Sequence, residues 1–235
     1  MKKILITLII IFFSRNNYSF SGDIGIRTGL SFSSFQENTQ LIGDLKYLTS
    51  LTYGLTFNFI IHKIFILQPE IIYSTKGIIG QSSKEYESDK GVIKLNYIEF
   101  PILLKVELIE FKENSFDLFA GPSFGKSLNH SYKYEYNSIT NSGVLEFKLD
   151  NINEIIETNM NIGIELNYKI FKYLMSLQIK YTKGLNRISN EVGVPAPFRS
   201  DYVILKPGVN IDGDNITLIP GIKHKSISIT FGVLL

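Results

Sequence analysis

The sequence predicts an all-β fold, an eight-stranded antiparallel up-and-down transmembrane β-barrel with long external loops. Three observations lead to this prediction. Eight segments alternate apolar and polar residues with a period of two, the N-terminus has the form of an export signal, and short and long connections alternate along the chain. An exported sheet that closes in lipid is apolar outside, polar inside and has short turns on one side of the membrane.

Residues 1–21 have the pattern of a secretory signal peptide. The start of the chain is basic, residues 4–13 are an apolar run, and Ser19 and Ser21 supply the small side chains of a cleavage site. This run is too short for a transmembrane helix, which needs about 20 residues. We therefore expect an outer-membrane β-barrel domain over residues 22–235, and retention of the signal as an uncleaved anchor is the alternative.

The first four strands follow from the parity of their apolar residues. In 23–33 the even-numbered positions are mostly apolar, and in 51–59 the odd-numbered positions are apolar. The segments 64–74 and 97–108 alternate in the same way, but four of their apolar residues fall on the polar side, which leaves the local register open. These residues are Ile64, Ile66, Ile72 and Leu103.

The last four strands are predicted at 116–125, 159–168, 173–182 and 226–235. The segments 159–168 and 173–182 have the cleanest alternation, with Asn, Gly, Gln or Lys between apolar residues. Every predicted strand therefore has one apolar and one polar face.

Connection lengths separate the two ends of the predicted barrel. The links at 61–63, 109–115 and 169–172 are short, and those at 35–49, 76–93, 127–158 and 183–225 are long. Outer-membrane barrels combine tight periplasmic turns with extended external loops in this way. A water-soluble exported barrel that holds an apolar ligand also alternates and remains open here, but it would turn its apolar face inward.

Aromatic residues concentrate near the ends of the predicted strands. Outer-membrane barrels carry two such aromatic girdles, one at each membrane interface. We expect the outer girdle to contain Phe32, Tyr53, Tyr73, Phe124 and Tyr181, and the inner girdle to contain Phe59, Phe65, Phe116, Tyr168 and Tyr173.

Three prolines conflict with a closed sheet. Pro69, Pro101 and Pro122 lie inside predicted strands, and a barrel has no free edge where a missing amide donor is harmless. We expect β-bulges or widely spaced pairs at these positions.

Charged residues on the polar faces form the main candidate site. An eight-stranded barrel is just wide enough to be filled by side chains, so these charges must pair with one another. We expect a lumen network that closes the barrel, and an ion or proton path is the alternative. The network should contain Arg27, Glu70, Glu99, Lys105, Glu107, Asp117, Glu165 and Lys180.

The sequence offers weak catalytic candidates. His130 with Ser131, or His224 with Asp212 and Asp214, could form the acid–histidine set of a hydrolase. Nothing in the spacing enforces contact, so we expect these histidines and His62 to be scattered surface residues. The segment 212–215 lacks the ligands of a calcium loop and is expected to be a turn. We therefore predict no catalytic set, no cofactor and no metal.

The external loops are the expected place for binding. Residues 131–136 and 144–149 alternate on either side of 141–143, which predicts a hairpin that extends beyond the bilayer. Its tyrosines and charges suit a protein or glycan partner.

Three segments resemble a known family in order and spacing. Residues 68–77 (QPEIIYSTKG), 95–105 (LNYIEFPILLK) and 119–125 (FAGPSFG) are similar to the PorT-like outer-membrane β-barrel family, and 181–188 resembles its usual exit from the seventh strand. The resemblance implies a Gram-negative outer membrane, insertion by the barrel-assembly machinery and, for some relatives, a role in protein secretion. The chain departs from most such barrels because it ends on Leu235 rather than an aromatic residue.

Composition excludes several other classes. The chain has no cysteine, so it has no disulfide, lipidated cysteine or thiolate metal site. A net charge of +2 does not mark a nucleic-acid binder. The sequence therefore favours a non-enzymatic barrel surrounded by outer-membrane lipid, with a structural or partner-binding role, and an outer-membrane lipid or peptide hydrolase is the alternative.

Overall fold

The computed structural model describes residues 22–35, 44–84, 87–137, 142–148, 156–186, 193–195, 211–212, 215–217 and 223–234. The predicted signal peptide, residues 1–21, lies outside these ranges. Within them, no helix has the length and apolarity needed to cross a membrane.

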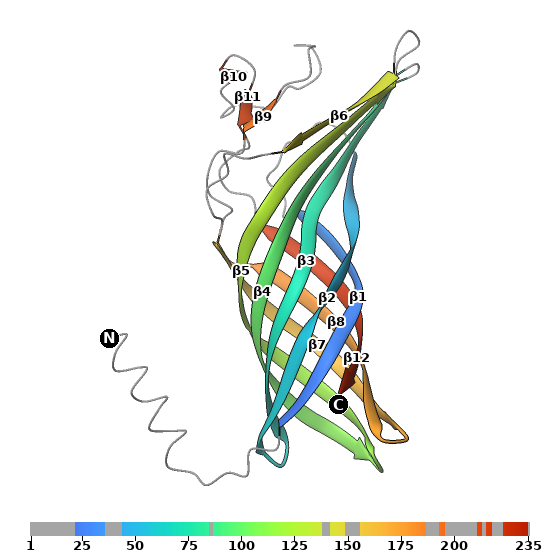
Figure 1. The fold of residues 1–235 in the computed structure, drawn as a ribbon, viewed down its shortest axis with the longest axis vertical. Coiled ribbons are helices and arrows are strands. Elements are labelled where there is room, and N and C mark those ends of the chain that lie inside the picture. Colours follow the sequence, from blue (N-terminus) through green and yellow to red (C-terminus); the bar gives the residue numbers. More distant parts are fainter. Residues whose placement is uncertain are drawn as a thin grey trace, which may run out of the picture.

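Eight long strands form a closed antiparallel ring (Figure 1), which confirms the predicted fold class. Each strand pairs with its neighbours in the chain order, and pairing of the first with the last closes the ring. The ring strands are β1 (Gly22–Phe35), β2 (Asp44–His62), β3 (Phe65–Lys84), β4 (Glu87–Phe111), β5 (Asn114–Asn137), β7 (Ile156–Ile170), β8 (Tyr173–Gly184) and β12 (His224–Leu234).

Four short strands lie outside the ring. β6 (Ser142–Lys148) pairs with the far part of β5. β9 (Gly193–Pro195), β10 (Ile211–Asp212) and β11 (Asn215–Thr217) form a separate small sheet.

The two faces of the ring follow the predicted parity. Ile26 is 58% exposed and its neighbour Arg27 is 3% exposed, and Ile162 and Asn161 differ in the same way at 53% and 1%. The apolar side chains thus point outward and the polar ones point into the lumen. This arrangement excludes the water-soluble barrel, whose apolar face would have to line the interior.

Two-residue turns join the strands at one end of the barrel, where outer-membrane barrels meet the periplasm. Lys63–Ile64, Lys112–Glu113 and Phe171–Lys172 form these turns, as expected from the short links. Lys112 and Phe171 have positive φ angles of 57° and 55°. Glycine is the usual residue at the first central position of such a turn, so both positions are conformationally costly for the side chains they carry.

At the external end the strands extend further than the sequence analysis predicts. Residues 76–93, expected to be a loop, are mostly a hairpin of β3 and β4 that closes at the Lys84–Glu87 pair. The expected hairpin after β5 is confirmed, but Ser142 and Gly143 are paired within it, with Asn137 opposite Ser142. The connection therefore lies at 138–141, outside the described residues. We call the extended sheet the external blade; it consists of residues 78–84 of β3, 87–95 of β4, 129–137 of β5, and β6. Its base, which includes the buried Ile78 and Ile93, still covers the external end of the lumen, and its far part rises above the ring in Figure 1.

The prolines interrupt the ladders without β-bulges, one of the two arrangements that the sequence analysis expects there. Around Pro69 the ladder of β2 and β3 stops at Thr56–Glu70 and resumes at Phe59–Leu67 in the same register. The same gap without a shift occurs next to Pro101 and Pro122. The register shifts lie elsewhere, for example between Glu107 and Ile109. A missing donor is therefore tolerated by losing local pairs while the register on both sides is kept.

The open register of β3 and β4 is resolved by lumen packing. Ile72 and Leu103 point inward and are 6% and 0% exposed, beside the inward aromatic residues Tyr97 and Phe119. Apolar side chains thus fill part of the lumen together with the charges. At its external end a further buried apolar layer contains Leu48, Ile78, Ile93 and Leu95.

Candidate functional site

The lower part of the lumen contains a linear series of ion pairs, which we call the lower ion chain. It begins at Lys180, whose Nζ lies 3.1 Å from Glu70 Oε2. Glu70 also contacts Arg27 Nε at 3.5 Å, and Arg27 Nη2 lies 3.0 Å from Glu165 Oε2. Lys105 continues the series, 2.8 Å from Glu165 Oε1 and 3.0 Å from Asp117 Oδ2.

Six different strands supply the six charges of this chain, which alternate in sign. β8, β3, β1, β7, β4 and β5 contribute one group each, so three cations meet three anions. None of the six side chains is more than 10% exposed. Buried charges are tolerated when each is paired and hydrogen-bonded, and this chain meets that condition as a neutral unit.

Uncharged side chains complete the coordination of the lower ion chain. Gln178 donates to Glu165 at 2.9 Å and Gln68 donates to Glu70 at 2.6 Å. Asn167 donates to Asp117 at 2.7 Å, and Arg27 donates to Thr230 at 3.3 Å. The amides of these inward positions thus add hydrogen bonds to carboxylates that the ion pairs already hold, although Asp117 Oδ1 remains buried without a hydrogen bond.

A second group, the upper ion cluster, lies nearer the external end. Lys76 Nζ contacts Glu99 Oε2 at 3.0 Å and Glu157 Oε2 at 2.9 Å. Glu157 also contacts His224 Nδ1 and accepts a hydrogen bond from the Tyr97 hydroxyl at 3.2 Å. Lys76 Nζ lies 4.9 Å from the centre of the Tyr97 ring, which adds a cation–π contact.

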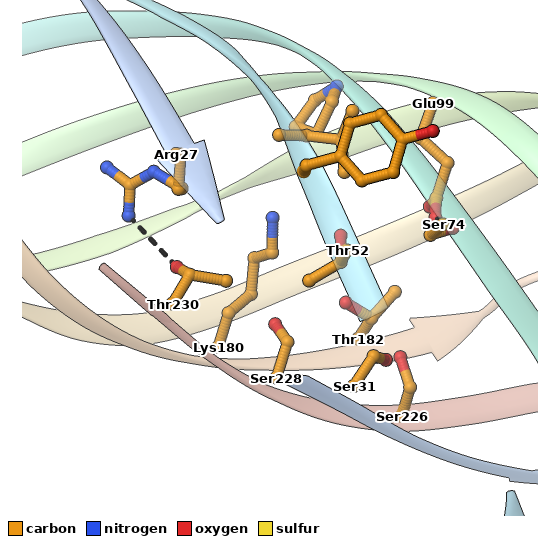
Figure 2. A pocket seen from close by; sticks show the side chains of 13 residues that line it. Arg27, Ser31, Thr52, Ser74, Glu99, Lys180, Thr182, Ser226, Ser228 and Thr230 are labelled. Carbon is orange, nitrogen blue, oxygen red and sulfur yellow. Dashed lines mark hydrogen bonds between the residues drawn. The ribbon is translucent and has the colours of Figure 1, made fainter. Parts of the chain in front are cut away.

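A small polar cavity separates the two groups of charges. Its volume is about 20 Å³, enough for a water molecule, which needs about 10–15 Å³. Figure 2 shows Arg27 and Lys180 of the lower ion chain on one side and Glu99 with Ser74 on the other. Hydroxyl groups line the space between them, from Ser31, Thr52, Thr182, Ser226, Ser228 and Thr230.

The structure brings together seven of the eight predicted lumen charges. Arg27, Glu70, Lys105, Asp117, Glu165 and Lys180 form the lower ion chain, and Glu99 belongs to the upper ion cluster. Glu107 does not join them. It is half-buried next to the register shift in β4, close to the periplasmic turns.

Sequence reasoning missed three members of the upper ion cluster. Lys76 and Glu157 fall in segments expected to be loops, and His224 was expected to be a surface residue, which is wrong because it is 2% exposed. The signal was present: each residue has the parity of the inward positions in its own strand. Continuing the alternation beyond the predicted strand ends would have found all three.

The remaining catalytic candidates do not assemble among the described residues. His62 is exposed at the end of β2. The side chains of His130 and Asp212, and all of Asp214, lie outside the described part of the chain. In that part, no group of three or more His, Asp or Glu side chains is arranged to hold a metal ion.

The predicted girdle residues lie on outward positions. Tyr53 and Tyr73 pair across β2 and β3, and their rings stack with centroids 5.1 Å apart. Tyr168, Tyr173, Phe124 and Tyr181 are exposed, and Phe32, Phe59, Phe65 and Phe116 are half-buried. The depth of these rings in a membrane stays a prediction.

A closed eight-stranded sheet with an apolar exterior and a filled, charge-paired interior defines a small outer-membrane β-barrel. The chain belongs to the family described as "Outer membrane protein beta-barrel domain", whose model matches residues 16–190. The protein is therefore located in the outer membrane. No curated protein matches the chain significantly.

Several solved structures are similar in fold to this chain. Ail, the attachment invasion locus protein of Yersinia pestis, is 8% identical, with 91% of this chain and 97% of Ail covered and a TM-score of 0.37. Neisserial surface protein A is also 8% identical, with coverages of 90% and 96% and a TM-score of 0.41. The outer-membrane protease OmpT from Escherichia coli is 10% identical, with coverages of 93% and 98% and a TM-score of 0.40.

We predict that Arg27→Met strongly destabilises the barrel. The substitution leaves the buried carboxylates of Glu70 and Glu165 without their shared cation, and breaking a buried ion pair costs about 3–5 kcal/mol. Urea unfolding in lipid vesicles measures the free energy of unfolding. Lys169→Met is the control: it breaks the exposed pair with Glu113 and should cost about 0–1 kcal/mol. Equal losses for both variants would contradict a structural role of the lower ion chain.

We also predict that Lys105→Met is more damaging alone than together with Asp117→Leu. The single change leaves Asp117 buried without its cation, whereas the double change removes a whole pair, which is often nearly neutral. Glu165 keeps Arg27 as a partner in both variants. The same unfolding experiment gives the coupling energy of the pair, and additive losses would show that the two groups are independent.

Proposed function

We propose that this protein is a non-enzymatic outer-membrane barrel with a closed lumen, which acts by presenting the external blade to a protein or glycan partner. The observation that carries the proposal is the blade itself. β3, β4 and β5 continue for many residues beyond the ring, although a barrel needs only about 9–11 residues per strand to cross the bilayer. The extra length serves no membrane-spanning purpose.

The ion pairs of the lumen support the absence of a channel. The lower ion chain joins groups from six strands, and the cavity above it holds about one water molecule. Eight-stranded barrels of this kind leave no aqueous pore. An ion crossing the lumen would have to break several buried pairs, so the interior serves stability and the ends of the barrel remain for function.

The chemistry of the blade supports recognition of a polar macromolecule. Glu135 of β5 contacts Lys133 of the same strand at 2.6 Å and Lys90 of the neighbouring strand β4 at 3.5 Å. The hydrogen bond from Lys133 and the positive charges of both lysines lower the pKa of the Glu135 carboxyl below its ordinary value, so it remains anionic outside the cell. A rigid sheet with fixed charges of both signs gives electrostatic selectivity to a partner.

We infer further that the chain belongs to the PorT-like branch of these barrels. The segments 68–77, 95–105 and 119–125 resemble the PorT-like branch of these barrels, and a role as an accessory of protein secretion would be one use of the blade. The partner would then be a component or a cargo of a secretion system. Insertion into the membrane would rely on the barrel-assembly machinery.

A hydrolase remains the second candidate because His224 contacts an acid, Glu157, near the external end. Their side chains are 1% and 3% exposed, and Lys76 shares the same carboxylate. A substrate carbonyl has no access to this pair in the closed lumen. The contact is therefore better explained as part of the charge balance.

We predict that the wild-type protein gives no steady current in planar lipid bilayers. The lower ion chain closes the lumen, so Arg27→Met should change stability more than conductance. A reproducible single-channel current from the folded wild-type protein would contradict the closed lumen. Folding is checked by the heat-modifiable migration of the barrel on gels.

We predict that the external blade carries partner binding. In the test variant a short Gly-Ser turn replaces residues 129–153, and in the matched control Asn-Gly replaces Lys63-Ile64 at the opposite end. Both are placed in nanodiscs and screened against glycan arrays and exported proteins. Binding that is present in the wild type and control but lost in the blade variant supports the proposal. Retained binding in the blade variant would move the site elsewhere.

We predict that His224→Gln and His130→Ala change no catalytic turnover. Purified protein in vesicles is tested for phospholipid and peptide hydrolysis beside empty vesicles. Wild type and variants should all match the empty vesicles, while His224→Gln should unfold at lower urea concentration because it weakens the upper ion cluster. Turnover by the wild type that disappears in either variant would instead identify a hydrolase.

A further inference from the structure

An apolar groove lies on the outer surface of the barrel at its periplasmic end. Its volume is about 490 Å³, within the range of about 300–1,000 Å³ for small-molecule sites. Outward side chains of five strands line most of it. They include Ile109, Phe116, Leu166, Met175 and Phe231.

The groove coincides with a local irregularity of the sheet. β4 and β5 change register between the pairs Glu107–Asp117 and Ile109–Phe116. The extra residue, Leu108, makes consecutive side chains of β4 point to the outside, where Leu108 and Ile109 are 53% and 62% exposed. A β-bulge bends a strand and re-aims its side chains. It thereby interrupts the regular apolar surface where Phe111 and Ile109 meet the groove.

Three lysines lie close in the chain to residues that line the groove, at its periplasmic end. Lys112 and Lys172 lie in the adjacent turns, with Nζ 5.6 Å from the Phe111 ring and 5.1 Å from the Tyr173 ring. Lys169 Nζ contacts Glu113 at 2.9 Å and joins the two turns. Glu107, Glu110 and Glu113 are the neighbouring carboxylates. Glu113 is paired with Lys169, whereas Lys112 and Lys172 form no ion pair within the described part of the chain. These two ammonium groups are therefore available to an anion.

We propose that this groove binds one anionic glycerophospholipid of the periplasmic leaflet. An acyl chain would occupy the apolar groove, and the phosphate would contact Lys112 and Lys172. The location suits this ligand, because the groove opens on the apolar outer side and Lys112 and Lys172 sit in the turns, where lipid headgroups are expected. Aromatic rings and lysines are also the side chains that anchor proteins at this interface. The proposal is independent of the role of the external blade.

The test measures lipid retained by the purified full-length barrel in native mass spectrometry. Dioleoyl phosphatidylglycerol and dioleoyl phosphatidylcholine are added separately to the detergent-solubilised protein. The wild type should retain one phosphatidylglycerol and little phosphatidylcholine. Each basic residue near a membrane surface contributes about 1 kcal/mol toward anionic lipid. The double variant Lys112→Gln/Lys172→Gln should therefore lower phosphatidylglycerol retention about tenfold or more.

Three further variants distinguish a specific lipid site from general electrostatic attraction. Lys63→Gln removes an exposed lysine from the turn between β2 and β3, away from the groove, and should leave retention of phosphatidylglycerol unchanged. Met175→Trp fills the groove and should reduce retention of phosphatidylglycerol, whereas Ile64→Trp in the turn between β2 and β3 should not. Equal retention of both lipids, unchanged retention in the double lysine variant, or an equal loss in Lys63→Gln would each overturn the proposal. Heat-modifiable migration verifies that every variant is folded.

Discussion

A closed ring of eight strands leaves an interior that side chains must fill, and the rest of the structure follows from this constraint. Every inward polar group is removed from water, so it must find a partner on another strand or carry an unfavourable desolvation cost. The lower ion chain meets this requirement with five contacts among six strands. Its alternating signs make the lower ion chain neutral, and the same contacts join six of the eight strands.

The filled interior also determines where function can reside. Lipid covers the apolar sides, and the lumen is occupied by the lower ion chain, the upper ion cluster and a buried apolar layer above Lys76. The two ends of the barrel are the surfaces that remain. They differ in construction, because the external end is an extended sheet with fixed charges and the periplasmic end consists of two-residue turns. Each end therefore suits a different kind of contact.

The fold could be predicted from the sequence because alternation determines which side of each strand faces lipid. The same signal identified seven lumen charges, because a charged side chain on an inward position, such as Arg27 or Glu165, must lie inside the closed barrel. Alternation alone could not identify the partners of these charges. Arg27 contacts Glu70 and Glu165 because of the order of the strands in the ring and the register between them, and both are determined only when the ring closes. Glu107 keeps the inward parity and pairs with Asp117, but it lies at the end of the lumen, only half-buried, where it does not need a cation from another strand. The burial of His224 was not predicted because the predicted strand begins at residue 226, whereas β12 begins at His224.

The periplasmic turns show that some residues are explained only by the surroundings of the barrel. Phe171 is 94% exposed and holds a positive φ of 55°, a conformation that costs a side-chain-bearing residue roughly 1–2 kcal/mol. Its ring is almost entirely free of contacts that could offset that cost within the chain, and glycine would fit the turn better. The compensating interaction must come from outside the protein. At the membrane interface an aromatic ring beside Lys172 gains apolar contact while the ammonium group stays hydrated, so the turn is adapted to the bilayer at the expense of its own backbone.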